Sequence, residues 1–153
     1  IINKLNTQKN IYNLVYMNHN IQTNRKERIL PYQILSNKKF VTSELGYNGQ
    51  NFDNYIDNVY NHKFVICPEG NGIDTHRTWE TLYLESIPIE KRNINNQFYT
   101  DLPICFVDSW EEITEDFLNK EYNRIINTTW NLDKLDFNWW KNKIRNEYLH
   151  NTL

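Results

Sequence analysis

The sequence lacks long apolar runs and an excess of charge of either sign. No apolar run approaches the ~18–20 residues that a membrane-spanning helix needs. No basic segment followed by an apolar one opens the chain, so we expect no signal peptide here. Lys and Arg number 17 and Asp and Glu 19, a net charge of −2. This balance argues against a dedicated binder of nucleic acid or anionic membranes.

Cysteine and alanine are also scarce. The two cysteines, Cys67 and Cys105, each stand in an apolar run, which favours two buried free thiols in strands over a disulfide. Free thiols in turn favour a cytoplasmic location. Alanine is absent and asparagine abundant, as expected of an AT-rich coding sequence. We therefore take the abundance of asparagine as no functional signal.

What is present indicates one folded domain over residues 1–153. The length of 153 residues fits a single domain, and 14% of the residues are aromatic, whereas disordered chains are poor in aromatics. The chain begins with Ile1 and not with Met, so we expect it to be a piece of a longer protein, with a processed N-terminus as the alternative.

Short apolar segments alternate with segments of helical periodicity along the chain. Strands are predicted at 12–17, 39–42, 63–67, 87–89 and 103–107, and helices at 52–61, 75–85 and 137–149. A capping box at 109–112 predicts a further helix start, 94–100 a short helical turn and 46–50 a loop. Pro31 either starts or breaks a helical turn. The alternation predicts an α/β sandwich with a mostly parallel sheet.

The segment from Phe64 to Glu80 carries the chemistry. It reads as a strand, a glycine-containing loop and a helix, and parallel sheets bind ligands at the carboxyl ends of their strands. The free N–H groups of a helix N-terminus suit phosphate, and Gly70 and Gly72 allow close backbone approach or positive φ. Arg77 in the first turn can pair with a diphosphate, and Glu80 can accept ribose hydroxyls.

A purely structural interpretation of the same segment stays open. The two glycines can simply shape a turn. Asp74 or Thr75 can cap the helix. Arg77 and Glu80 can form an i,i+3 ion pair worth ~0.2–0.5 kcal/mol. Spacing alone does not separate these alternatives from a phosphate site.

A longer pattern resembles a known family. Residues 63–83 (KFVICPEGNGIDTHRTWETLY), 87–89 (IPI) and 102–113 (LPICFVDSWEEI) look like the donor-binding half of exostosin-like glycosyltransferases. There an apolar strand precedes P-x-G-N-G-x-D-x-H-R-x-W/Y-E-x-L, a small turn and I-P-I/V. The match covers about residues 60–120. The resemblance implies a Rossmann-like three-layer sandwich, the C-terminal half of a two-domain GT-B enzyme.

The resemblance also implies which residues meet the donor. The loop glycines lie near the phosphates, His76 and Arg77 meet the diphosphate and Glu80 meets the ribose. The donor-binding set is Gly70, Asn71, Gly72, Asp74, His76, Arg77 and Glu80. No catalytic base is assigned, although Asp74 and His76 stand near the right place. No D-x-D motif is present, and such enzymes generally bind the donor without metal, so we expect neither metal nor separate cofactor.

The function implied is transfer of a sugar from a nucleotide-sugar to a hydroxyl of a glycan or protein, with inversion. An N-terminal Rossmann-like domain outside this chain would be the partner and would supply the base, so the isolated chain is expected to bind donor without turnover. The alternative is a catalytically inactive GT-B-like binding or structural module. A nucleotide binder unrelated to glycosyl transfer explains the His76-Arg77 pair less well.

Three further positions have two interpretations each. The family usually has glycine where Glu85 stands, so this turn is expected to be strained or shifted. Arg25 and Arg28 are expected to belong to a solvated helix face, with a second phosphate contact as the alternative. Three tryptophans suit core or interface packing better than stacking on a ligand: Trp130, Trp139 and Trp140.

Overall fold

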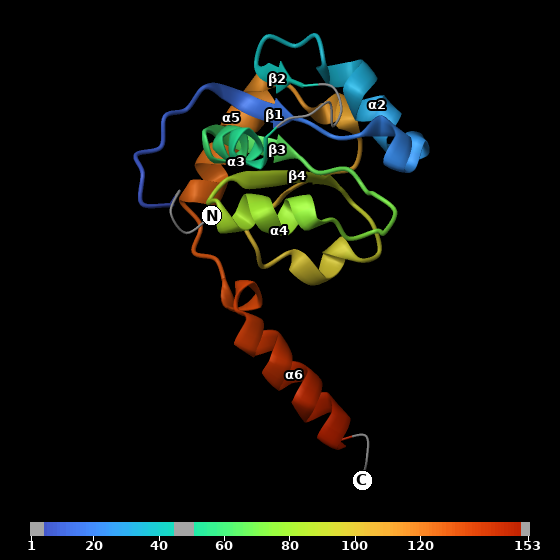
Figure 1. Cartoon of the computed structure of the whole chain (residues 1–153), viewed down its shortest axis with the longest axis vertical. Coiled ribbons are helices and arrows are strands. Elements are labelled where there is room, and N and C mark those ends of the chain that lie inside the picture. The colour runs from blue at the N-terminus through green and yellow to red at the C-terminus, as the bar shows by residue number, and fades with distance from the viewer. Residues whose placement is uncertain (1–4, 45–50, 151–153) are drawn as a thin grey trace.

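Five parallel strands form one sheet at the centre of the molecule (Figure 1). The computed structural model describes residues 5–44 and 51–150, the side chains of 148–150 excepted. The strand order is β2-β1-β3-β4-β5, and every pairing is parallel. The strands are β1 (Asn13–Met17), β2 (Val41–Ser43), β3 (His62–Ile66), β4 (Ile87–Lys91) and β5 (Cys105–Val107).

Helices cover both faces of this sheet (Figure 1). Side chains of α2 (Arg25–Leu35) and α5 (Glu115–Ile126) share one core cluster with alternate strand residues. On the other face, α3 (Phe52–Tyr60) packs on Tyr16 and Val65, and α4 (His76–Tyr83) packs beside it. The predicted α/β class and Rossmann-like three-layer sandwich are therefore confirmed.

The central strand shows why the sequence forms this sheet. Phe64 and Ile66 point into one helix layer and Val65 into the other, and all three are fully buried. A strand buried on both faces reads as a continuous apolar run, which is typical of parallel sheets. Cys67, next after β3, and Cys105 in β5 are both buried free thiols, as predicted.

Two boundary predictions were wrong. Pro31 neither starts nor breaks a helix, because α2 runs through it to Leu35. The capping box at Ser109, whose N–H donates to Glu112 Oε1 at 2.8 Å, closes only the 3₁₀ turn η3 (Trp110–Glu112). Helix α5 begins later, with Thr114 as its N-cap. The predicted loop at 46–50 lies outside the described residues.

The turn after α4 adopts the strained form that the sequence favoured. Glu85 has φ 56°. Its N–H donates to Leu82 O at 3.0 Å, and the N–H of Ser86 donates to Thr81 O at 3.0 Å. These two bonds form a Schellman motif, whose left-handed position usually holds glycine. The turn therefore holds a glutamate in a conformation that glycine usually adopts.

The C-terminal segment leaves the sandwich. Beyond the 3₁₀ turn η4 (Asp133–Leu135), α6 (Phe137–His150) projects away from the sheet (Figure 1). Trp130 packs against the core and donates its indole N–H to Ile125 O at 2.8 Å, so the core interpretation is confirmed for it. Trp139 and Trp140 stack edge to face with centroids 4.7 Å apart. None of the described helices has both the length and the apolar character that crossing a bilayer requires.

Candidate functional site

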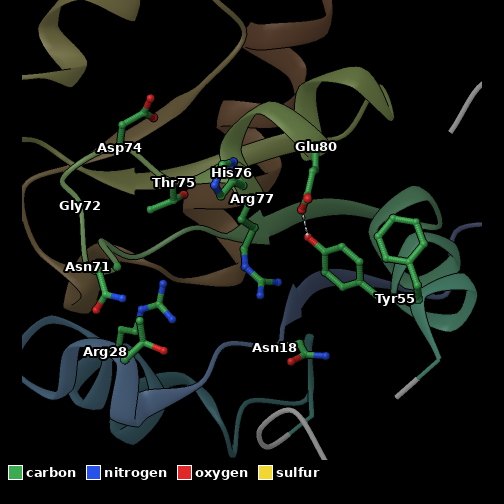
Figure 2. A pocket seen from close by; sticks show the side chains of 13 residues that line it. Asn18, Arg28, Tyr55, Asn71, Gly72, Asp74, Thr75, His76, Arg77 and Glu80 are labelled. Carbon is green, nitrogen blue, oxygen red and sulfur yellow. Dashed lines mark hydrogen bonds between the residues drawn. The ribbon is translucent and has the colours of Figure 1, made fainter. Parts of the chain in front are cut away.

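The candidate site lies where the strand order reverses. Strand β2 lies on one side of β1, and β3 lies on the other. The connections that follow β1 and β3 therefore run in opposite directions, and the loops after these two strands diverge. Ligands of open parallel sheets bind at such switch points, beyond the carboxyl ends of the strands. A cavity of about 450 Å³ occupies this position (Figure 2).

The cavity gathers all seven predicted donor-binding residues: Gly70, Asn71, Gly72, Asp74, His76, Arg77 and Glu80. Six further residues line the cavity: Asn18, Thr23, Arg28, Phe52, Tyr55 and Thr75. The sequence analysis did not assign these residues to the site, except for Arg28, which it named as an alternative phosphate contact. Most of these come from the connections after β1 and before β3. One signal for Asn18 was available, because it directly follows the first predicted strand.

The glycine loop is held by Arg28 of α2 and by Asn24, the N-cap residue of that helix. Arg28 Nε donates to Glu69 O at 2.8 Å, and Asn24 Nδ2 donates to Gly70 O at 2.9 Å. A Cβ on Gly70 would lie 2.9 Å from Arg28 Nη2, which is too close. Neither Gly70 nor Gly72 has a left-handed φ. The missing side chain at Gly70 therefore leaves room for the Arg28 guanidinium, and neither glycine is needed for a positive φ.

Arg28 belongs to the cavity wall, so the solvated-face interpretation was wrong for it. Its side chain is half-buried, while Arg25 is exposed. Burial lowers the pKa of Arg28, and the positive charge of Arg77 lowers that pKa further. Two guanidinium groups that repel each other across one cavity are stabilised by an anion between them.

Arg77 points into the middle of the cavity (Figure 2). Its guanidinium carbon lies 5.2 Å from the centre of the Tyr55 ring, a cation–π contact. Its Nη1 is buried and has no hydrogen-bond partner among the described residues. A buried donor without a partner is destabilising, and a ligand oxygen would satisfy it.

The N-terminus of α4 is open toward the cavity. Thr75 occupies the N-cap position but makes no side-chain bond to the backbone of the first turn. The Asp74 carboxylate accepts the indole N–H of Trp79, at 3.1 and 3.2 Å, and is turned away from Arg77 (Figure 2). Neither residue caps the helix in the way that the structural interpretation required. The first N–H groups of α4 thus have no side-chain acceptor at the N-cap.

Glu80 is fixed by Tyr55 and not by Arg77. The Tyr55 hydroxyl donates to Glu80 Oε2 at 2.6 Å (Figure 2), and no ion pair joins Glu80 to Arg77 among the described residues. Burial raises the pKa of Tyr55, while the charge of Arg77 opposes this and the bond to Glu80 adds to it. The phenol therefore stays a donor, and Glu80 keeps its second oxygen for another hydrogen bond.

A buried histidine contacts the backbone of α2 at Arg28, one of the cavity-lining residues. His19, only 4% exposed, lies 2.9 Å through its Nε2 from Arg28 O. Because a carbonyl only accepts, Nε2 carries the proton and donates it. Burial lowers the pKa of His19 to about 4, although the bond to Arg28 O partly offsets this. The ring is neutral near pH 7 and acts as a support for α2.

Comparisons with known proteins add no assignment. No protein-family model matches the chain, and no curated protein matches its sequence. Within residues 5–44 and 51–150, no three His, Cys, Asp or Glu residues gather in a group that could hold a metal ion.

Proposed function

We propose that this chain binds the diphosphate of a nucleotide-sugar and serves as the donor domain of a glycosyltransferase. One observation carries the proposal: Arg77, with its unpartnered buried Nη1, faces Arg28 at the β1–β3 switch point. Guanidinium groups and open helix N-termini are both suited to phosphate oxygens. The resemblance to exostosin-like enzymes supports the same ligand.

The cavity suits the two ends of such a donor. Its phosphates would lie between the 70–72 loop, Arg77 and Arg28. Its ribose would lie toward Glu80, whose free oxygen can accept a hydroxyl while Tyr55 holds the other. A sugar diphosphate diester carries two negative charges, and the two guanidiniums balance them.

Transfer of the sugar to a hydroxyl with inversion requires a base that deprotonates the acceptor. We assign that base to a domain outside this chain, so the chain alone binds donor without turnover. The inactive-module alternative predicts the same binding with no transfer by the complete protein. The Glu85 turn does not favour that alternative, because it lies at the far end of α4 and does not line the cavity.

Calorimetric titration with UDP, GDP, CMP and their sugars tests the proposal. Arg77→Ala should weaken nucleoside diphosphates by about 10- to 100-fold, the effect of a charge-assisted contact of ~1.5–3 kcal/mol. Glu80→Gln should weaken nucleotides while sparing free pyrophosphate. Arg124→Ala, an exposed arginine on α5, is the matched control and should leave affinity unchanged.

Two results would contradict the assignment. One is the absence of any heat or melting-temperature response to nucleoside diphosphates at millimolar concentration. The other is an equal loss of every ligand, pyrophosphate included, in Arg77→Ala and Glu80→Gln. In that case both residues hold the fold and not the donor.

A further inference from the structure

A buried carboxyl group is connected to the candidate site through two hydroxyl groups. Glu90 lies in β4 and is 9% exposed. The Thr78 hydroxyl bonds to Glu90 Oε1, and the Thr75 and Thr78 hydroxyl oxygens lie 3.2 Å apart. Thr75 lines the cavity beside Arg77 (Figure 2). A chain of three polar groups thus runs from the interior to the N-terminus of α4.

The other carboxyl oxygen is held in place from the opposite side. Asn96 Nδ2 donates to Glu90 Oε2 at 3.1 Å and to Lys91 O at 2.8 Å. Asn96 Oδ1 accepts the N–H of Asn93 at 3.0 Å, so the Asn96 amide is fixed in this orientation. Asn93 in turn donates to Glu69 Oε1 at 2.9 Å. Because Asn96 is a fixed donor to Oε2, a proton on Glu90 belongs on Oε1, toward Thr78.

The hydrogen bonds among Glu90, Thr78 and Thr75 can be arranged in two ways, which differ in the direction of donation. When Glu90 is ionised, Thr78 donates to it and Thr75 donates to Thr78, so the Thr75 oxygen can only accept on its cavity side. When Glu90 is protonated, it donates to Thr78, Thr78 donates to Thr75, and the Thr75 O–H is free to point into the cavity. The second arrangement offers a bound anion one more hydrogen-bond donor.

Electrostatics link this choice to the ligand. Burial raises the pKa of Glu90, the bonds from Thr78 and Asn96 lower it, and the nearby Asp74 and Glu69 raise it. An anion held at Arg77 would add another negative charge near the carboxyl and would favour its protonated form. Glu90 also lines a second, smaller cavity in the sandwich. Six titratable or charged groups face Glu90 or line that smaller cavity: Glu27, Cys67, Glu69, Asp74, Lys91 and Tyr99.

We propose that anion binding at the N-terminus of α4 is coupled to uptake of one proton by Glu90, which reverses the Thr78 and Thr75 hydroxyls so that Thr75 donates to the anion. The proton comes from solvent, and no bond between heavy atoms changes. Glu90 is thus a positioning residue that acts through Thr78. The nature of the anion rests on the proposed function, but the coupling does not.

Proton uptake on binding can be counted by calorimetry in buffers of different ionisation enthalpy. The probes are UDP-glucose and inorganic sulfate, because neither has a phosphate monoester group that titrates near pH 6. The wild-type chain should take up a measurable fraction of one proton on binding at neutral pH. Its Kd should rise with pH by at most about tenfold per unit, the limit for one linked proton.

Glu90→Gln gives the sharpest outcome. The amide can donate to Thr78 and accept from Asn96, so it mimics the protonated acid. It should take up no proton, its Kd should not vary with pH, and it should bind several-fold more tightly than wild type at pH 8. A merely structural role for Glu90 predicts weaker binding instead. Thr78→Val, which breaks the hydroxyl chain between Glu90 and Thr75, should reduce the uptake, and it can be measured even if Glu90→Gln fails to fold.

Each other outcome decides a specific point. His76, also in the cavity, is the rival proton acceptor. Uptake that disappears in His76→Asn and persists in Glu90→Gln overturns the coupling proposed here. Binding of both probes with no uptake overturns it but leaves the proposed function intact. If sulfate binds with proton uptake but UDP-glucose does not bind, the coupling stands and the proposed function is overturned. If neither probe binds, both proposals are overturned.

Discussion

The turn at Glu85 offers a direct test of strain in this fold. Its φ of 56° is a conformation that glycine adopts freely and other L-residues rarely do. The Schellman bonds from Glu85 and Ser86 are made by the backbone, so glycine at position 85 would keep both. Lys9 Nζ donates to Glu85 O at 2.7 Å, and this bond too is independent of the side chain. Glu85→Gly therefore removes strain without removing a hydrogen bond.

The expected gain is small because three effects compete. The left-handed conformation costs a non-glycine residue roughly 1–2 kcal/mol. Against this gain, glycine raises the conformational entropy of the unfolded chain, which lowers the stability by ~0.4–1 kcal/mol. The attraction between exposed Glu85 and Lys9 is also lost, and pairs of this kind are worth ~0.2–1 kcal/mol. The midpoints of these ranges leave a net stabilisation of about 0.2 kcal/mol for Glu85→Gly, and the most favourable combination leaves ~1.4 kcal/mol.

Urea unfolding, followed at two wavelengths to check two-state behaviour, measures this difference. Glu85→Gln is the matched control, because it removes the charge and keeps the strain. The Gly variant should exceed the Gln variant in free energy of unfolding, with equal denaturant slopes. Destabilisation by glycine of about 1 kcal/mol relative to Gln would mean that position 85 is helical. The reasoning on strain would then be refuted.

Three further outcomes follow from the site and the core. Gly70→Ala should weaken nucleoside diphosphates several-fold, because its Cβ would displace Arg28; an unchanged Kd would show that Arg28 makes no ligand contact. Tyr55→Phe should lower the free energy of unfolding by about 1 kcal/mol, for loss of the bond to Glu80, and a change near zero in urea unfolding would contradict the buried contact. Burial raises the pKa of both cysteine thiols to about 12, so neither should react with a thiol reagent at pH 8 until denaturant is added, and fast labelling of the native chain would refute this.

Much of the fold followed from local signals in the sequence. Apolar runs such as 63–67 predicted strands because a strand covered on both faces must be apolar throughout. Element boundaries were harder to predict where the same sequence pattern occurs in two kinds of secondary structure. Ser109 and Glu112 form the same reciprocal bonds on a 3₁₀ turn as on a helix, so the capping box did not reveal that α5 starts at Glu115. Pro31 is tolerated inside α2, where the sequence alone predicted an end or a start.

Part of the candidate site was likewise predictable from the sequence, and part was decided only by tertiary packing. The loop and first turn at 70–80 were predictable because a strand, a glycine loop and a helix lie in sequence order and carry their polar groups locally. Only the tertiary structure brought Tyr55 to Glu80 and Arg28 under Gly70, since these contacts join residues 25 and 42 positions apart. Whether Arg77 pairs with Glu80 or stays open to a ligand depended on that packing. The sequence determined which groups are present at the switch point, and the packing of α2 and α3 against the loop decided which of them remain free to bind.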